Sequence, residues 1–128
     1  DRPWKTQEII HKIRKDFYND TPAGLCGNED CGQMSAWYIF SAMGFYPVCP
    51  GSNFYNIGTP LFKNVTIHLE NDKTFKISAK NISESNIYVQ SVYLDGKKLD
   101  RPYIGHQEIL NGKELVYEMG DEKTVFWK

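Results

Sequence analysis

The sequence predicts an α+β fold in which helices come first and a small antiparallel β-sheet or sandwich follows. Apolar residues recur at helical spacing in the first part of the chain, whereas in the second part they alternate with polar residues. The 128 residues, 41% of them hydrophobic, are enough for one domain of ordinary size with a core. We therefore expect a helical part, residues 1–52, and a strand-rich part, residues 53–128.

The first helix is expected to begin near Pro3, because proline suits the first position of a helix. Asn19 and the following Thr21-Pro22 are expected to end it. Four apolar residues at three-to-four spacing form one stripe along this helix: Ile9, Ile10, Ile13 and Phe17. This spacing predicts an amphipathic helix.

The second helix is apolar on nearly all sides. Asp30 is expected to be its N-cap, since Gln33 follows at the spacing of a capping box, and Gly44 is expected to end it. No Lys, Arg, Asp or Glu occurs between Cys31 and Ser52. Such a helix must be covered on all sides, and it is too short to cross a membrane. We therefore expect an inner helix of a larger helical assembly, and a chain that is poorly soluble when expressed alone.

The second half of the chain is expected to form short strands separated by turn sequences. The dipeptide Asp95-Gly96 predicts a type I′ hairpin turn, and Asn111-Gly112 predicts a further turn. The expected strands are residues 65–69, 75–79, 87–94, 97–104, 115–119 and 124–127. Strands at such regular intervals are typical of an antiparallel sheet or sandwich.

Charge and cysteine content exclude several function classes. The formal net charge of −1 gives no electrostatic reason to expect a nucleic acid or an anionic membrane as partner. The three cysteines are Cys26, Cys31 and Cys49, so at least one is unpaired within this chain. The spacing of the first two allows a small disulfide, but ordinary loop or buried cysteines are the favoured interpretation. A zinc site is not expected, because the histidines are scattered.

The segment around Glu29 and Asp30 is the strongest candidate for chemistry. These two acidic residues lie between Gly27 and Gly32, at the start of the second helix. Glycines allow the backbone to approach a ligand, and a helix N-terminus supplies unpaired N–H groups. A carboxylate there suits a general base or a metal ligand. The alternative, that Asp30 is only a helix cap, stays open, and Trp37 is expected to pack in the core or to stack on a sugar.

The string GLCGNEDCGQMSAWYIFSAMGFYPVCPGS resembles the signature of glycoside hydrolase family 92, as do PWKTQE before it and YNIGTPLFKNVTIHL after it. The resemblance covers essentially the whole chain. It implies a calcium-dependent, inverting exo-α-mannosidase, periplasmic or secreted in bacteria, with a β-sandwich before an (α/α)6 barrel. Residues 1–52 would be the last helices of that barrel, and residues 53–128 a C-terminal β segment.

The same resemblance assigns roles to individual residues. Asp30 matches the general base and is a candidate ligand of Ca²⁺, whereas Asn28 stands where some members have a second aspartate. Asn28, Glu29 and Gln33 are candidate substrate-binding residues. An inverting glycosidase needs a second carboxyl group about 6.5–9.5 Å from the first. No other carboxylate of this chain has a comparable setting, so we expect the general acid upstream and this fragment alone to be inactive.

The expected partners are a mannose-containing glycan and the rest of the protein's own chain, without nucleic acid or membrane. The alternative from another class is a non-catalytic carbohydrate-binding or structural β module. It would require three tyrosines to line one exposed face: Tyr88, Tyr93 and Tyr103.

Overall fold

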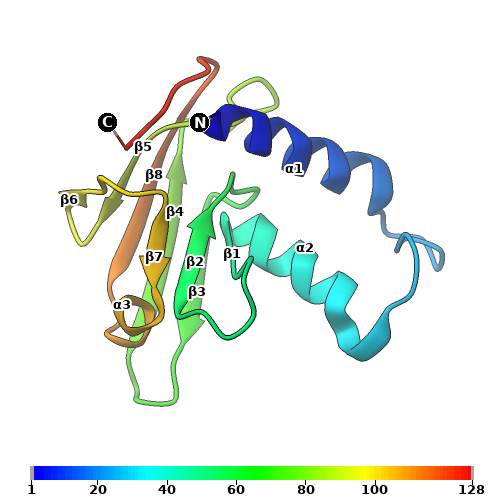
Figure 1. Ribbon diagram of the computed structural model, residues 1–128, viewed down its shortest axis with the longest axis horizontal. Helices are drawn as coiled ribbons and strands as arrows, with labels where there is room; N and C mark the ends of the chain where they lie inside the picture. The colour runs from blue at the N-terminus through cyan, green and yellow to red at the C-terminus, as the bar shows by residue number, and fades with distance from the viewer. Residues whose placement is uncertain (1, 128) are drawn as a thin grey trace.

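The computed structural model describes residues 2–127. Two main helices come first: α1 is Pro3–Phe17 and α2 is Gln33–Met43, preceded by the one-turn 3₁₀ helix η1, Asp30–Gly32. Both helices extend away from the strands, and the loop that joins them lies at the far end of the molecule (Figure 1). These bounds confirm the two predicted helices to within three residues.

The strands form two sheets. The smaller sheet is antiparallel, with the order β1 (Phe45–Tyr46), β2 (Phe54–Ile57), β7 (Tyr103–Gly105). The larger sheet has the order β3 (Asn64–His68), β4 (Thr74–Lys80), β8 (Glu114–Gly120), β5 (Tyr88–Leu94), β6 (Lys97–Lys98). A short helix, α3 (His106–Leu110), precedes β8. The α+β class is confirmed. Because β1 pairs with β2 across the boundary expected after residue 52, the division into two parts stays a prediction.

Three details of the β part differ from the sequence-based expectation. The large sheet is mixed, because β4 and β8 run parallel, a pairing between distant segments that alternation cannot reveal. The strand expected at 97–104 splits between the two sheets; Pro102, which has no N–H to donate, lies between its two pieces. The strand expected at 124–127 is absent among the described residues, and Phe126 packs into the core instead.

The end of α2 is fixed against the large sheet by Tyr117. This side chain of β8 is fully buried, and its hydroxyl donates a hydrogen bond of 2.9 Å to the carbonyl oxygen of Gly44. Burial raises the pKa of Tyr117, so the hydroxyl keeps its proton. Gly44 has a φ of +100°, and a Cβ there would lie 2.8 Å from the tyrosine oxygen. Only glycine therefore allows both the helix end and this contact.

The two residues of α1 that are buried are both polar. Gln7 is 1% exposed, and its Oε1 accepts a hydrogen bond from the backbone N–H of Val89. Arg14 is 6% exposed, and its Nη1 donates to carbonyl oxygens of two other segments. Two residues of the predicted apolar stripe, Ile9 and Phe17, are 48% and 47% exposed. Only part of the stripe therefore faces the strands: Ile10 is half-buried and lines a small cavity together with Phe45 and Ile57.

The apolar helix α2 is only partly covered by the described residues: Phe40 and Met43 pack against the core, but one face stays exposed. Ser41 and Ala42 are its buried residues, whereas Ile39 is 51% exposed. An apolar helix face of this kind is typical of a surface that packs against further protein.

The buried Arg14 gives a testable expectation for stability. Replacing Arg14 with methionine removes the donor that pairs with the carbonyl oxygen of Thr59, a residue that is itself buried. We expect the free energy of unfolding of the full-length protein to fall by about 1–3 kcal/mol in a urea titration, since an unsatisfied buried polar group carries that cost. Lys12→Met, on the exposed side of the same helix, is the control and should change it by less than about 0.5 kcal/mol. Equal effects would contradict the role given to Arg14.

The ion pair at the start of α1 predicts a dependence of stability on pH. The Oε1 of Glu8 accepts from Lys123 Nζ at 2.7 Å and from the Tyr88 hydroxyl at 2.8 Å. The hydrogen bonds from Lys123, Tyr88 and Lys5 lower the pKa of Glu8 from 4.5 to about 2. Its contribution is therefore complete above pH 4.5 and is lost as the pH falls from 4.5 through about 2. We expect Tm of the wild type to exceed that of Glu8→Gln at pH 6, and the difference to vanish near pH 2; a constant difference would contradict this.

Candidate functional site

The loop before α2 owes its shape to residues with positive φ. Gly27 has a φ of +96°, Cys31 of +54° and Gly32 of +76°. Left-handed backbone at Cys31 costs about 1–2 kcal/mol, because its Cβ approaches the following carbonyl oxygen. Two left-handed residues in succession turn the chain just before α2 begins at Gln33.

The structure assigns the cap of α2 to Glu29, not to Asp30. The N-cap position of α2 is Gly32, which has no side chain to offer. The Oε1 and Oε2 atoms of Glu29 accept the backbone N–H of Ser35 at 3.1 and 3.2 Å. Ser35 is the third residue of α2, so this is the amide that a capping side chain normally binds. The predicted cap role of Asp30 is therefore wrong, because the left-handed turn at Cys31 brings Glu29 over the helix end instead.

The other candidate side chains of the segment are exposed. Asn28 precedes Glu29 in the loop, Asp30 begins η1, and Gln33 is the first residue of α2. The four predicted site residues thus lie within six consecutive positions at one end of the molecule. All four are exposed at this end, and the carboxylate of Glu29 also accepts the backbone N–H of Ser35. This arrangement offers a solvent-facing carboxylate with an amide side chain on either side along the chain.

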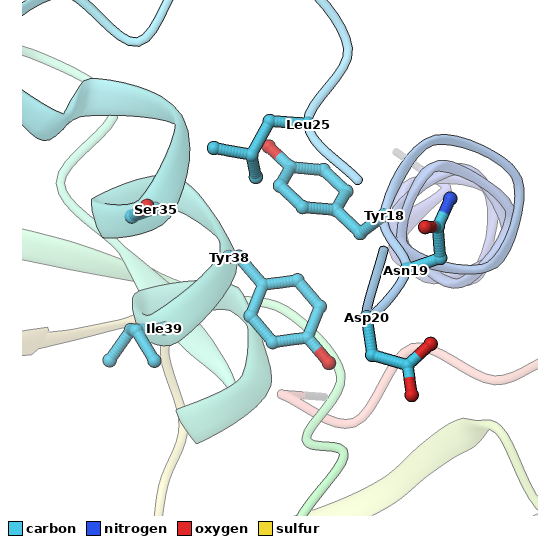
Figure 2. A pocket seen from close by; sticks show the side chains of 7 residues that line it. All are labelled: Tyr18, Asn19, Asp20, Leu25, Ser35, Tyr38 and Ile39. Carbon is cyan, nitrogen blue, oxygen red and sulfur yellow. The ribbon is translucent and has the colours of Figure 1, made fainter. Parts of the chain in front are cut away.

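An aromatic pocket lies beside this loop. It has a volume of about 370 Å³ and is lined by Tyr18, Asn19, Asp20, Leu25, Ser35, Tyr38 and Ile39. Figure 2 shows the rings of Tyr18 and Tyr38 one above the other, in the gap between the end of α1 and α2. Ser35 lines the pocket and also donates its backbone N–H to Glu29, so the pocket and the acidic loop both contact this residue.

Tyr18 is a structural residue of this site that the sequence did not indicate. Its hydroxyl donates to the carbonyl oxygen of Met34 at 3.2 Å, and its ring stacks on Trp37 with centroids 5.5 Å apart. Burial, and then the nearby carboxylate of Glu29, raise the pKa of Tyr18. Trp37 was expected to pack in the core or to stack on a sugar; here it stacks on Tyr18. The sequence could not indicate this role, because the contacts of Tyr18 with Met34 and Trp37 join two separate helices and follow no local spacing.

The cysteines and the metal-ligand count limit what this segment can do by itself. Cys26, Cys31 and Cys49 are free and exposed, so the disulfide that the spacing allowed is not formed. Within residues 2–127, no three His, Cys, Asp or Glu side chains gather closely enough to hold a metal ion. The loop nevertheless offers oxygen donors, the carboxylate of Asp30 and the amide oxygens of Asn28 and Gln33, which are the kind that Ca²⁺ prefers. It could therefore supply part of a calcium site.

No helix in the described part of the chain is both long and apolar enough to span a bilayer.

Comparison with known families and proteins gives one consistent picture. The sequence model described as the glycosyl hydrolase family 92 catalytic domain matches residues 1–121. A protein of Arthroderma benhamiae described as an uncharacterized secreted glycosidase is 36% identical over 126 residues. That match covers 96% of this chain and 16% of the relative.

Solved structures agree with this picture. An α-mannosidase of family GH92 from Bacteroides thetaiotaomicron, in complex with mannoimidazole, superposes with a TM-score of 0.89 at 46% identity. An inverting mannosidase of the same family and organism superposes with a TM-score of 0.86, also at 46% identity. Each match covers 94% of this chain and 16% of the solved chain. The chain thus spans about one sixth of the length of the relatives that it matches.

Proposed function

Because the chain belongs to glycosyl hydrolase family 92, we propose that it is the C-terminal part of a longer α-mannosidase. The substrate would be the terminal α-mannosides of mannan or N-glycan chains. The similarity of nearly the whole chain to a solved α-mannosidase is the observation that carries this proposal. The ligand bound to that relative, mannoimidazole, supports a mannose-type sugar.

In this proposal Asp30 is the general base of an inverting hydrolysis. Its carboxylate takes a proton from a water molecule while the water oxygen attacks the anomeric carbon. A second carboxylic acid gives its proton to the oxygen of the leaving sugar, on the opposite face of the ring. Asp30 suits the first role because its side chain is exposed, in a loop whose backbone turns at Gly27, Cys31 and Gly32. The acid would come from the rest of the protein, and this fragment alone would therefore be inactive.

The two exposed amides of the loop would bind the sugar or the attacking water. Asn28 precedes the base by two residues, and Gln33 follows it by three at the start of α2. An amide can both donate to and accept from a hydroxyl group, as sugar recognition requires. Substrate contact by Glu29 stays a prediction, since both its oxygens face the N–H of Ser35.

We also propose that the complete site binds Ca²⁺. Asp30 would contribute a carboxylate oxygen, and most of the six to eight oxygen ligands that Ca²⁺ takes would come from outside this chain. The bound ion would supply positive charge that binds and orients sugar hydroxyls. Because a relative is described as secreted, we propose a secreted or periplasmic location for the protein.

The alternative of a carbohydrate-binding β module lacks the aromatic face that it requires. The Tyr88 hydroxyl is bound to Glu8 beneath α1. Tyr93 lies on β5 of the large sheet, whereas Tyr103 lies on β7 of the small one. Since Tyr103 lies on a different sheet from Tyr88 and Tyr93, and Tyr88 is engaged by Glu8 of α1, this arrangement does not favour a sugar-stacking surface.

Replacing Asp30 tests the proposed function directly. In the full-length protein, Asp30→Asn should lower kcat by about 10²–10⁴, the usual contribution of a general base, with little change in the folded structure. Asp72→Asn, an exposed aspartate in the turn between β3 and β4, is the control and should keep near-normal kcat. The measurement is steady-state hydrolysis of an aryl α-mannoside. Near-normal activity of Asp30→Asn would exclude it as the base.

Removal of calcium is a second test. Chelation of Ca²⁺ should abolish hydrolysis by the full-length protein, and addition of Ca²⁺ should restore it. Magnesium should restore less, because it demands a stricter octahedral geometry and keeps its water ligands. Unchanged activity after exhaustive chelation would contradict the calcium proposal while leaving the role of Asp30 intact.

A further inference from the structure

We propose that Glu29 is a positioning residue, which holds Asp30 in its reactive position by binding the start of α2. This inference rests on the proposed role of Asp30 as general base. Glu29 would act through its neighbour and would not itself touch the reacting atoms.

Two hydrogen bonds of Glu29 enclose Asp30. The carbonyl oxygen of Glu29 accepts the N–H of Gly32 at 3.2 Å, and its carboxylate accepts the N–H of Ser35 at 3.1 and 3.2 Å. The residue before Asp30 is thus tied to two residues after it, one through its backbone and one through its side chain. The backbone of Asp30 lies inside this closed loop, so the contacts of Glu29 restrict the backbone position from which the side chain of Asp30 extends.

The chain between these contacts is strained and therefore needs support. Cys31 adopts a φ of +54° without being a glycine, a conformation that persists only where surrounding contacts impose it. Gly32, which also has a positive φ, faces Glu29: a Cβ at Gly32 would lie 3.7 Å from Glu29 Oε1. The carboxylate of Glu29 is the side chain that secures this turn on the side of the helix.

The helix end to which Glu29 binds is itself fixed. Tyr18, just after α1, donates its hydroxyl to the carbonyl oxygen of Met34, the residue before Ser35. The ring of Tyr18 stacks on Trp37 one turn further along α2. The N–H of Ser35 is therefore part of a rigid junction between two helices, and Glu29 transmits that rigidity to the loop.

Rigidity of this kind matters for a general base. The carboxylate must hold its water within hydrogen-bond reach and in line with the anomeric carbon, and a misplacement of about 1 Å can cost about 10²-fold in rate. A carboxylate with both oxygens on a backbone N–H is poorly placed to serve as base itself. Both acids are exposed, but they would have different roles: the carboxylate of Glu29 binds the start of the helix, and that of Asp30 is left for the attacking water.

The test compares Glu29→Ala with Glu29→Gln in the full-length protein. Glutamine keeps an oxygen that can accept the N–H of Ser35, whereas alanine removes the acceptor. We expect Glu29→Ala to lower kcat by about 10- to 100-fold, the cost of a misplaced base, with KM within about twofold of wild type. Glu29→Gln should recover most of kcat.

Three results would overturn the inference. One is a normal kcat in Glu29→Ala, and another is a loss in both variants alike, which would mean that the charge matters and not the hydrogen bond. The third is a rise in KM with unchanged kcat, which would assign Glu29 to substrate binding.

Hydrogen exchange keeps this test separate from the test of Asp30. Peptides that contain Ser35 should exchange faster in Glu29→Ala than in wild type or Glu29→Gln, whether or not Asp30 is the base. Faster exchange together with an active Asp30→Asn variant would refute Asp30 as the base, while the hydrogen bond of Glu29 to the start of α2 would still be supported. An inactive Asp30→Asn variant with unchanged exchange and normal kcat in Glu29→Ala would refute the positioning role alone.

Discussion

The guanidinium of Arg14 joins the parts of the chain on which the candidate site depends. Its Nη1 donates to the carbonyl oxygen of Ser41 near the end of α2, at 2.9 Å, and to that of Thr59 in the segment before β3, at 2.8 Å. The hydroxyl of Thr59 in turn donates to Ile87, just before β5. Burial lowers the pKa of Arg14 to about 10, so the group remains charged at neutral pH. Arg14 thus connects α1, α2 and the segment before the large sheet, and Gln7 and Tyr18 add contacts of α1 with the sheet and of its end with α2.

Because polar side chains occupy the buried positions of α1, several large apolar side chains of the two helices remain exposed to solvent. The buried residues of α1 are Gln7 and Arg14, whereas Phe17 of α1 and Ile39 of α2 are about half exposed. About half of the surface of these apolar side chains is therefore uncovered within residues 2–127. Their burial would be completed by the rest of a longer protein, as the proposed function requires. The acidic loop would then lie at the junction between this part of the chain and the part that supplies the acid and most calcium ligands.

The sequence predicts local features of this fold better than long-range ones. Helical spacing located α1 and α2, Gly44 marked a helix end, and Asp95-Gly96 forms the expected turn with positive φ at both residues. The parallel pairing of β4 with β8 joins distant segments, so no local pattern contains it. The candidate site residues were located because they are contiguous. That Glu29 and not Asp30 caps α2 depends on the left-handed turn at Cys31, and a cysteine in the sequence does not indicate such a conformation.

The central claim is that Asp30 is the general base and that Glu29 positions the loop that carries it. A crystal structure of the full-length protein with a mannose-like inhibitor would test this claim most directly. The account predicts a water molecule about 2.6–3.2 Å from the carboxylate of Asp30, on the face of the sugar ring opposite the leaving group. It also predicts that both oxygens of Glu29 remain on the N–H of Ser35. A structure in which Asp30 points away from the sugar, while Glu29 binds the water, would contradict it.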